Sequence, residues 1–196
     1  MKKTIAAAVA AAALVLGSAV PANATGAAAP PQNIVEVAVA ASGGGTPDNN
    51  LGDYDILVQA LIATDLATVL ADASRQFTVF APNDRAFLRL VGDLTGTVPA
   101  SEADALAAIV GTFSIPQISN ILLYHVVADK KLGPLDVLTS RTIVMANGLV
   151  IRPLGPVLRD QNADLRNPVL VLRAINIQAS NGVIHTIDRV LVPVAP

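Results

Sequence analysis

The residues best suited to chemistry in this sequence are its two histidines, His125 and His185. His125 follows Tyr124 inside an aliphatic run, ILLYHVV, and the chain holds only two tyrosines. An imidazole buried in such a run either takes part in proton transfer or is held by hydrogen bonds at its ring nitrogens. A structural zinc site requires about four cysteine or histidine ligands. Because cysteine is absent, the two histidines do not predict one.

Acidic residues offer a second kind of chemistry, the binding of calcium. Residues 160–164, DQNAD, reproduce the D-x-N-x-D opening of a calcium-binding loop. Leu165 replaces the glycine of such loops and Val171 replaces their glutamate, so a solvated loop is favoured. Three aspartates further upstream are expected to be helix caps and loop residues: Asp48, Asp53 and Asp55. The sequence therefore predicts no metal and no cofactor.

The motifs of nucleophilic and phosphate chemistry are missing from the sequence. It contains no G-x-S-x-G elbow, no Walker loop, no G-x-G-x-x-G fingerprint and no cysteine nucleophile. A hydrolytic pair of carboxylates is left open, because the distance between two carboxylates depends on the fold. Such a pair would face each other in a cleft, with at least one perturbed pKa. The leading prediction is a protein that is not an enzyme.

The composition indicates a chain that is rich in core residues and does not bind nucleic acid. Hydrophobic residues make up 53% of the 196 residues and charged residues 14%, with a formal net charge of −2. Without an excess of lysine and arginine, the chain has no basic field for DNA or RNA. Without cysteine it forms no disulfide, so its stability depends on an aliphatic core.

The N-terminus has the three parts of a secretory signal peptide. Residues 1–3 give a positive start, residues 5–16 form an apolar run, and Ala22-Asn23-Ala24 is an A-x-A cleavage site. We expect a signal peptide over residues 1–24, cleaved after Ala24, and a linker over residues 25–32. A membrane anchor is the alternative, but the run is short for a span and no second one follows. The expected location is secreted, extracellular or periplasmic.

Helical signals dominate the first part of the domain. Apolar residues recur with a 3.6-residue period from Leu57 to Leu70, which predicts one helix. The run at 34–41 suits a short helix or a strand, and FTVFA at 77–81 is typical of a strand. Four positions carry residues that favour helix starts: Asn83, Ser101, Ser114, and either Asp53 or Asp55.

Strand signals dominate after residue 140. The dipeptide Asn147-Gly148 predicts a hairpin over residues 142–152 with a type I′ turn. Residues 169–172 predict another strand, and Asn181-Gly182 predicts a second hairpin over residues 175–192. Helices first and strands later indicate an α+β fold.

The predicted elements place both histidines on aliphatic faces. In a helix over residues 115–125, His125 falls on the apolar face, whereas Tyr124 points away from it and is expected to be partly exposed. In an extended strand, His185 shares a row with aliphatic side chains. Both histidines are therefore expected to be core residues that use both ring nitrogens.

Three stretches in a fixed order resemble the signatures of the fasciclin (FAS1) domain family. They are FTVFAPNDRAF at 77–87, the Tyr-His motif in LLYHVV at 122–127, and NGVIHTIDRVLVP at 181–193. The resemblance implies a FAS1 domain over residues 33–193, followed by a short tail over 194–196. It also implies the fold, a twisted β-sheet wedge packed with several α-helices.

The resemblance assigns roles to individual residues as well. Five positions lie in the structural motifs of the family: Pro82, Asn83, His125, His185 and Asp188. Asn83 departs from the pattern, because threonine is common at this capping position. Links to adhesion in the family imply an adhesion surface with Tyr124, Asn176 and Ile177. Integrin-binding animal members carry Asp-Ile at the latter pair, so Asn176 lacks the carboxylate that would coordinate an integrin's metal. The loops at 42–55 and 91–114 look longer than in minimal members and are candidates for partner specificity.

We therefore expect a secreted, non-enzymatic domain that mediates cell adhesion or binds extracellular matrix, cell-surface proteins or glycans. The expected partner is an extracellular or cell-surface macromolecule, with no nucleic acid and no integral membrane span. A soluble extracytoplasmic carrier of a small apolar or saccharide ligand is the alternative. A carrier would need an apolar pocket of at least about 300 Å³, whereas an adhesion domain would present an open surface.

Overall fold

A computed structural model describes residues 31–193 of the protein. The predicted signal peptide, most of the predicted linker and the C-terminal tail lie outside the described residues. Within them the chain forms helices and strands in the mixed order expected for the predicted α+β class. The helices are α1 (Ile34–Ala41), α2 (Asp55–Ala63), α3 (Leu66–Leu70), α4 (Asp84–Thr95), α5 (Glu102–Thr112), α6 (Ile115–Leu123), α7 (Pro134–Thr139) and the 3-10 helix η1 (Leu172–Ala174). The strands are β1 (Phe77–Pro82), β2 (Val126–Ala128), β3 (Ile143–Val144), β4 (Val150–Leu154), β5 (Val157–Arg159), β6 (Ile177–Ala179) and β7 (Gly182–Ile187).

Side-chain caps begin several helices. The Asn83 side-chain oxygen accepts the Ala86 N–H at 3.1 Å at the start of α4, and Ser101 caps α5 in the same way. Asn33 and Glu36 form a reciprocal capping box, which makes the run that follows a helix, α1. Each such bond satisfies a backbone N–H that helix geometry leaves unpaired.

The single helix predicted over residues 57–70 is wrong, because the chain breaks between α2 and α3. The Thr64 hydroxyl donates to the Ala60 carbonyl oxygen at 2.8 Å, and Asp65 has a left-handed φ of 58°. A residue in the left-handed region cannot continue a right-handed helix. The apolar period continues in α3 because the new helix packs on the same core.

The start of α2 is capped from a distance and not by Asp53 or Asp55, as the sequence suggested. The N-cap residue is Tyr54, and its side chain makes no capping bond. Instead, the Asp84 carboxylate at the start of α4 accepts the N–H groups of Asp55 and Ile56 at 3.1 and 2.8 Å. The carboxylates of Asp53 and Asp55 therefore do not accept the N–H groups at the start of α2.

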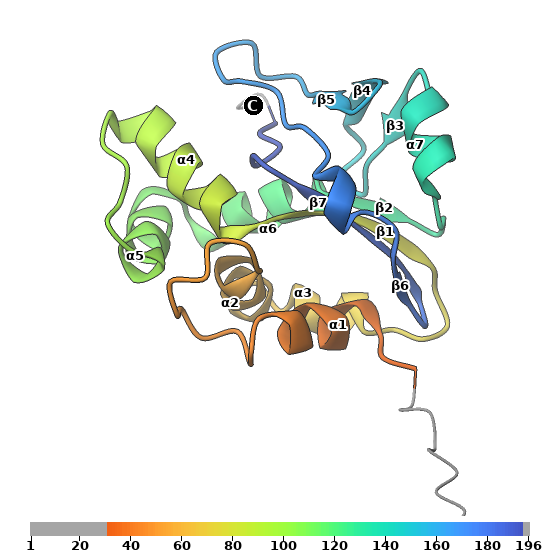
Figure 1. Cartoon of the computed structure of the whole chain (residues 1–196), viewed down its shortest axis with the longest axis horizontal. Helices are drawn as coiled ribbons and strands as arrows, with labels where there is room; N and C mark the ends of the chain where they lie inside the picture. The colour runs from red at the N-terminus through yellow and green to blue at the C-terminus, as the bar shows by residue number, and fades with distance from the viewer. Residues whose placement is uncertain (1–30, 194–196) are drawn as a thin grey trace, which may run out of the picture. The chain divides into compact units, whose positions relative to one another are not determined.

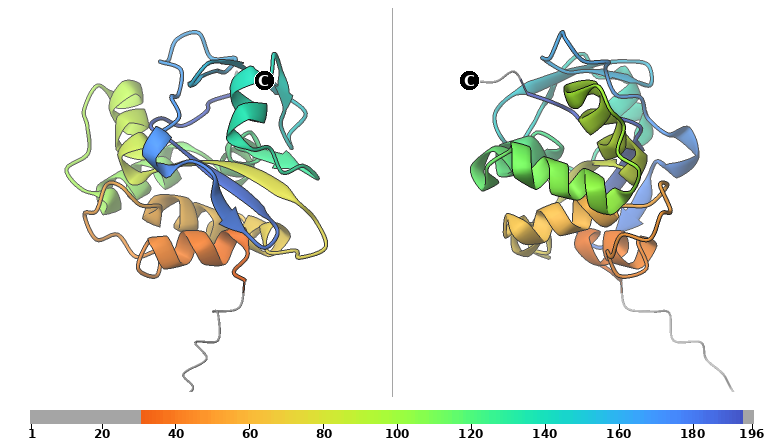
Figure 2. Two further views of the ribbon diagram at one scale, coloured as in Figure 1. Left: turned by 45° about the vertical axis from the view of Figure 1, so that its right-hand side comes forward. Right: turned by 90° about the vertical axis from the view of Figure 1, so that its left-hand side faces the viewer.

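Four strands form the central sheet in the order β2-β1-β7-β6. β1 and β7 run parallel, with Phe77 opposite Gly182 and Pro82 opposite Ile187, and the edge strands β2 and β6 are antiparallel to their neighbours. Every residue of β1 and β7 is buried, as expected for inner parallel strands covered on both faces. Figure 1 and Figure 2 show α1, α2 and α3 on one side of this sheet, and the remaining strands with α7 on the other.

A smaller antiparallel sheet has the order β3-β4-β5. The hairpin predicted around Asn147-Gly148 is confirmed, but its type I′ turn is wrong. Only Gly148 of the pair has a positive φ, 82°, and its N–H donates to the Met145 carbonyl oxygen at 2.9 Å. The Asn147 side chain donates to the Asn120 side-chain oxygen at 3.2 Å, a tertiary contact that overrides the local turn preference.

The strand predicted over residues 169–172 is reduced to two isolated bridges followed by η1. Val169 pairs with Val157 in β5, and Leu170 pairs with Ile187 in β7, so this segment links the two sheets. The second predicted hairpin is confirmed as β6–β7, but β7 ends at Ile187 and does not continue to residue 192.

The two faces of the central sheet bury two hydrophobic clusters. The cluster beneath the helices includes Val79, Leu122 and Ile184. The cluster beneath the smaller sheet includes Phe80 and Ile187. Alternation of side chains along β1 and β7 produces this division, because successive residues point to opposite faces of a sheet.

No single helix within residues 31–193 has both the length and the hydropathy needed to cross a membrane. α5 and α6 reach these values only as a pair, which is bent by 110°.

Candidate functional site

Tyr124 is fully buried, so the expectation that it belongs to an exposed adhesion surface is wrong. α6 ends at Leu123, and the helical phase that would point Tyr124 outward therefore does not apply. Its hydroxyl donates to the Val150 carbonyl oxygen in β4 at 2.9 Å. Burial raises the pKa of Tyr124 to about 12. Tyr124 thus anchors the smaller sheet to the end of α6.

His125 is a buried residue with a hydrogen bond at each ring nitrogen, as the sequence predicts. Nε2 lies 2.8 Å from the Leu191 nitrogen and must accept, because a backbone N–H can only donate. Nδ1 then carries the proton and donates to the Ile121 carbonyl oxygen at 2.8 Å. Burial lowers the pKa of His125 to about 4, so the ring is neutral at physiological pH.

His185 is also buried and doubly bonded. Its Nε2–H donates to the Leu132 carbonyl oxygen at 2.9 Å, and Nδ1 accepts the Asn176 N–H at 3.2 Å. The ring stacks on Phe80 with a centroid distance of 5.9 Å, and burial lowers its pKa. Neither histidine lies beside a nucleophile among these partners, so both rings hold backbone segments in place.

The other motif residues also make contacts that join segments of the fold. Asp188 accepts the Val169 N–H at 2.8 Å and forms an ion pair with Arg89 at 3.1 Å. Pro82 ends β1 within the parallel pairing to β7, and Asn83 caps α4. These residues therefore hold in place the segments that follow the central strands β1 and β7.

Asn176 and Ile177 lie at the start of β6, away from Tyr124. Asn176 is exposed with a left-handed φ of 60°, and Ile177 is half-buried. β6 is one edge of the central sheet, whereas β2, which follows Tyr124 and His125, is the opposite edge. The structure therefore does not bring the three residues of the predicted adhesion surface together.

A wide groove lies between β2 and β3. It has a volume of about 420 Å³ and is lined by side chains from two segments, 127–132 and 140–148. Its lining combines aliphatic residues with Lys130, Ser140 and Thr142. Lys130, Thr142 and Val144 are exposed, so this β2–β3 groove is open to solvent.

One wall of the β2–β3 groove is held by buried polar side chains of the central sheet. The Thr78 hydroxyl donates to the Lys130 carbonyl oxygen and accepts the Leu132 N–H, both at 2.8 Å. His185 fixes the Leu132 carbonyl oxygen from the next strand. Residues of the first and third fasciclin-like stretches thus support the groove from behind, and His185 itself does not line it.

β2 turns main-chain groups toward the same region. The Phe80 N–H donates to the His125 carbonyl oxygen at 2.9 Å. Hydrogen-bonded pairs alternate along an antiparallel ladder, so Val126 and Ala128 direct their main-chain groups away from β1. The Val126 carbonyl oxygen accepts the Ala146 N–H at 2.7 Å, whereas Ala128 lines the groove.

The apolar cavities of the described region are smaller than the groove. A cavity of about 40 Å³ lies among side chains of α2, α4, α5 and α6, and another of about 20 Å³ lies beneath α1. A third, of about 180 Å³, shares Ala128 and Ala146 with the β2–β3 groove. The first two cavities are the size of one or two waters, so they cannot enclose a carried ligand.

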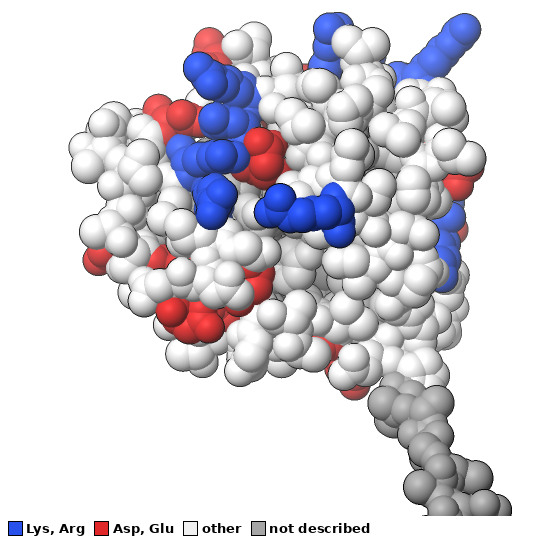
Figure 3. All heavy atoms as spheres, viewed as in Figure 1, with Lys and Arg blue, Asp and Glu red and all other residues white. Residues whose placement is uncertain are grey.

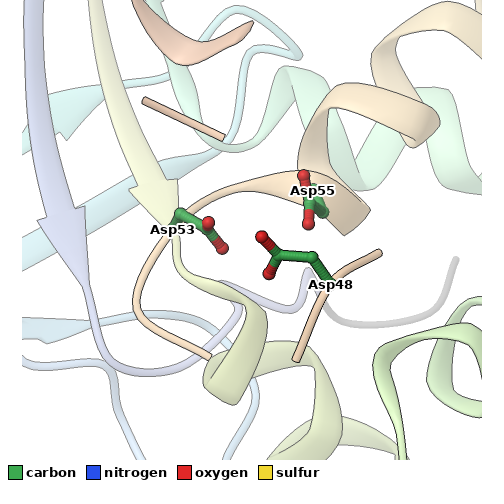
Figure 4. A group of neighbouring side chains, drawn as sticks. All are labelled: Asp48, Asp53 and Asp55. Atoms are coloured by element: carbon green, nitrogen blue, oxygen red, sulfur yellow. The ribbon is translucent and has the colours of Figure 1, made fainter. Parts of the chain in front are cut away.

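The residues that could hold a metal are carboxylates of the loop between α1 and α2 and of the first residues of α2, α4 and α5. Ligand oxygens of Asp48, Asp53 and Asp55 lie within 4.8 Å of one another, and so do those of Asp53, Asp84 and Glu102. Figure 4 shows the first three side chains pointing toward one another. The sequence predicts cap and loop positions for Asp48, Asp53 and Asp55, whereas the approach of Asp84 and Glu102 to this loop has no signal in the sequence.

Charges of both signs occur on the face shown in Figure 3. Basic side chains gather beside α4, and acidic side chains gather over the loop between α1 and α2. Two ion pairs join α4 to the segment after β7, Arg89–Asp188 at 3.1 Å and Arg189–Asp93 at 2.6 Å. The basic groups near α4 are thus partly neutralised by neighbouring carboxylates.

The fold and its signature contacts define the class of the protein. The sequence profile of the Fasciclin domain family matches residues 52–193, and the chain belongs to this family. The resemblance drawn from three short stretches is therefore confirmed, and so is the α+β fold.

Several proteins are similar to this chain. The uncharacterized protein sll1735 of Synechocystis is 33% identical over 162 residues, covering 81% of this chain and 96% of that protein. Immunogenic protein MPB70 of Mycobacterium bovis is 30% identical over 122 residues, covering 62% of this chain and 52% of that protein.

A solved structure with the same fold is the FAS1 domain pair from the insect cell adhesion molecule Fasciclin I. It superposes with a TM-score of 0.55 over 82% of this chain and 51% of that chain, at 18% sequence identity. At this identity the likeness concerns the fold.

Proposed function

We propose that the protein is an extracellular, non-enzymatic domain that binds macromolecules of the cell surface or matrix through the β2–β3 groove. Membership of a family associated with adhesion supports this proposal. The signal-peptide pattern over residues 1–24 supports the location. The buried, doubly bonded histidines support a structural and not a catalytic role for the Tyr-His motif.

The observation that carries the proposal is the open groove beside an edge strand. Ala128 directs its main-chain N–H and C=O groups away from β1, and aliphatic side chains such as Val144 flank it. An extended polypeptide can add to such an edge through main-chain hydrogen bonds while its side chains contact the groove. The favoured partner is therefore an extended segment of a protein.

A hydrolase is not favoured, although the structure contains facing carboxylates. Burial and the adjacent Asp53 carboxyl raise the pKa of Asp84 well above its usual range. Asp84 and Glu102 are fully buried, and Asp53 is almost so. A substrate would have to reach these carboxylates through packed side chains.

A pull-down tests the proposal. The purified chain is immobilised and exposed to cell-wall polymers, matrix proteins and the secreted proteins of its source. We expect capture by the wild type and at least a tenfold loss of affinity for Val144→Asp, which places a charge in the groove. Leu172→Asp is the matched control, because Leu172 is 62% exposed, close to the 60% of Val144, but lies outside the groove. Equal binding by both variants would remove the groove from the binding surface.

A carrier of a small apolar or saccharide ligand is the second candidate, and the volume of the groove favours it. The groove exceeds the roughly 300 Å³ that a small-molecule site requires. Native mass spectrometry of the chain purified from its source separates the two functions. One small molecule bound per chain would support the carrier and count against the adhesion domain.

A further inference from the structure

We propose that the loop between α1 and α2 forms a calcium site with the carboxylates of Asp48, Asp53 and Asp55 as ligands. Ligand oxygens of the three residues lie within 4.8 Å of one another. They come from one loop and the first residue of α2, and their side chains converge on one point (Figure 4). Three carboxylates at this separation can contact one cation together.

Unpartnered buried oxygens distinguish this cluster from ordinary loop and cap residues. Asp55 is 0% exposed, and neither of its carboxylate oxygens has a hydrogen-bond partner among the described residues. Asp53 is 6% exposed, and its Oδ1 likewise has none. A buried carboxylate without a partner is costly, so these oxygens require a positive group or a proton.

Each proposed ligand is held in place by a second polar group. Glu102 at the start of α5 accepts the N–H of Asp48 at 2.8 Å. The Asn50 amide donates to Asp53 Oδ2 at 2.9 Å, which leaves Oδ1 free for the cation. Behind Asp55, the Asp84 carboxylate accepts the Asp55 N–H at 3.1 Å. These bonds fix the backbone of Asp48 and Asp55 and one carboxylate oxygen of Asp53, so these parts of the site lose little freedom when a cation binds.

The charge of the cluster is not balanced by basic side chains. The three ion pairs of the described residues are Arg75–Asp129, Arg89–Asp188 and Arg189–Asp93, and none involves these carboxylates. The carboxylates of Asp48 and Asp53 lie beside that of Asp55, and like charges at this separation repel one another. A divalent cation would relieve this repulsion, and protons are the rival explanation.

The chemistry of the site selects calcium among the common cations. All the ligand atoms are carboxylate oxygens, which suit hard cations and not zinc or copper. A loop supplies the ligands, and calcium accepts such adaptable geometry, whereas magnesium demands a near-ideal octahedron. Asp48 is exposed, so an ion can enter from solvent and retain water ligands.

Isothermal titration calorimetry of the purified chain, stripped with a chelator, tests the site with CaCl₂ and MgCl₂. We expect one calcium ion per chain, with an affinity in the range of about 10⁻⁴ to 10⁻³ M that extracellular modules show. Calcium should bind at least about tenfold more tightly than magnesium and should raise the melting temperature. Magnesium binding as tight as calcium binding would overturn the calcium assignment.

Substitution of a ligand distinguishes a cation from a proton. Asp55→Asn removes a buried charge at constant size, so it should raise the melting temperature of the metal-free chain and abolish the calcium response. Asp164→Asn is the matched control, because Asp164 is exposed and belongs to the D-x-N-x-D stretch outside the cluster. It should leave the calcium response unchanged.

Two results would overturn the site. One is a wild-type chain that shows neither heat nor a melting shift up to about 10 mM calcium, ten times the weakest expected dissociation constant. Stabilisation by Asp55→Asn in that case would show that protons hold the cluster. The other is retention of the calcium response in Asp55→Asn, whatever the result for Asp164→Asn.

Discussion

The Nε2 atom of His125 accepts the N–H of Leu191 at 2.8 Å, which ties the end of α6 to the last segment of the domain. These residues are 66 positions apart in the chain. Leu191 is fully buried, so its N–H has no water to replace the imidazole. The bond therefore contributes stability chiefly because its loss would leave a buried donor unpaired.

Replacement of His125 by alanine should cost about 2–4 kcal/mol in the free energy of unfolding. The change leaves a cavity and removes the partners of the Leu191 N–H and the Ile121 carbonyl oxygen. Urea unfolding at neutral pH measures the cost. Ile62→Ala is the control, because Ile62 is 60% exposed and should change stability by less than about 0.5 kcal/mol. An unchanged urea midpoint for His125→Ala would contradict the structural role of His125.

The contribution of His125 should be lost as the pH falls from about 6.5 to about 4. Burial lowers its pKa to about 4 in the folded chain, whereas the unfolded chain takes up the proton near pH 6.5. The unfolded state binds more protons in this window, so stability falls with falling pH. The difference between the wild type and His125→Ala should shrink by about 3 kcal/mol between pH 7 and pH 4.

This difference isolates His125, because other titrating groups are present in both proteins. The same comparison between the wild type and Tyr124→Phe is the control. Tyr124 titrates only near pH 12, so that difference should stay constant from pH 7 to pH 4. A His125 difference that is equally constant would contradict the lowered pKa.

Tyr124→Ala should be as damaging as His125→Ala or more so, at about 3–5 kcal/mol. The ring is fully buried in the cluster beneath the smaller sheet, and its loss leaves a large cavity. Tyr124→Phe keeps the ring and removes only the bond to the Val150 carbonyl oxygen, so it should cost about 1 kcal/mol. Thermal melts of the two variants check this order, and a mild effect of Tyr124→Ala would restore the idea of an exposed ring.

Gly182→Ala should destabilise the domain by more than about 2 kcal/mol. Gly182 has a φ of 156°, and a Cβ there would overlap the Phe77 carbonyl oxygen in the neighbouring strand. Gly111→Ala is the matched control, because Gly111 lies in α5 with nothing within 4 Å of an added Cβ. It should stabilise the chain by about 0.5–1 kcal/mol. Chemical denaturation would contradict this reasoning if both variants moved in the same direction.

Local signals were enough to predict much of the fold. Asn83 and Ser101 begin helices because a side-chain oxygen and a nearby N–H suffice to form a cap. The hairpins around Asn147-Gly148 and Asn181-Gly182 follow from residue types in a few positions. The burial of both histidines follows from their aliphatic neighbours.

Features that depend on distant partners were not predictable in the same way. The buried Tyr124 hydroxyl donates to the Val150 carbonyl oxygen in β4, and no residue near Tyr124 in the sequence indicates this partner. The carboxylates of the proposed calcium site converge because Asp84 and Glu102 meet the loop from other helices. The spacing of residues within the loop does not predict that Asp84 and Glu102 lie beside it.

The parallel pairing of β1 with β7 has a consequence for how the domain is made. β1 ends at Pro82 and β7 begins at Gly182, so most of the described domain separates the two central strands. Such pairing has a high contact order, and loop closure over that length slows folding. A chain emerging from the ribosome cannot complete its core until β7 has been synthesised. Shortened products that lack β7 would leave the inner edge of β1 bare and ready to pair with other chains.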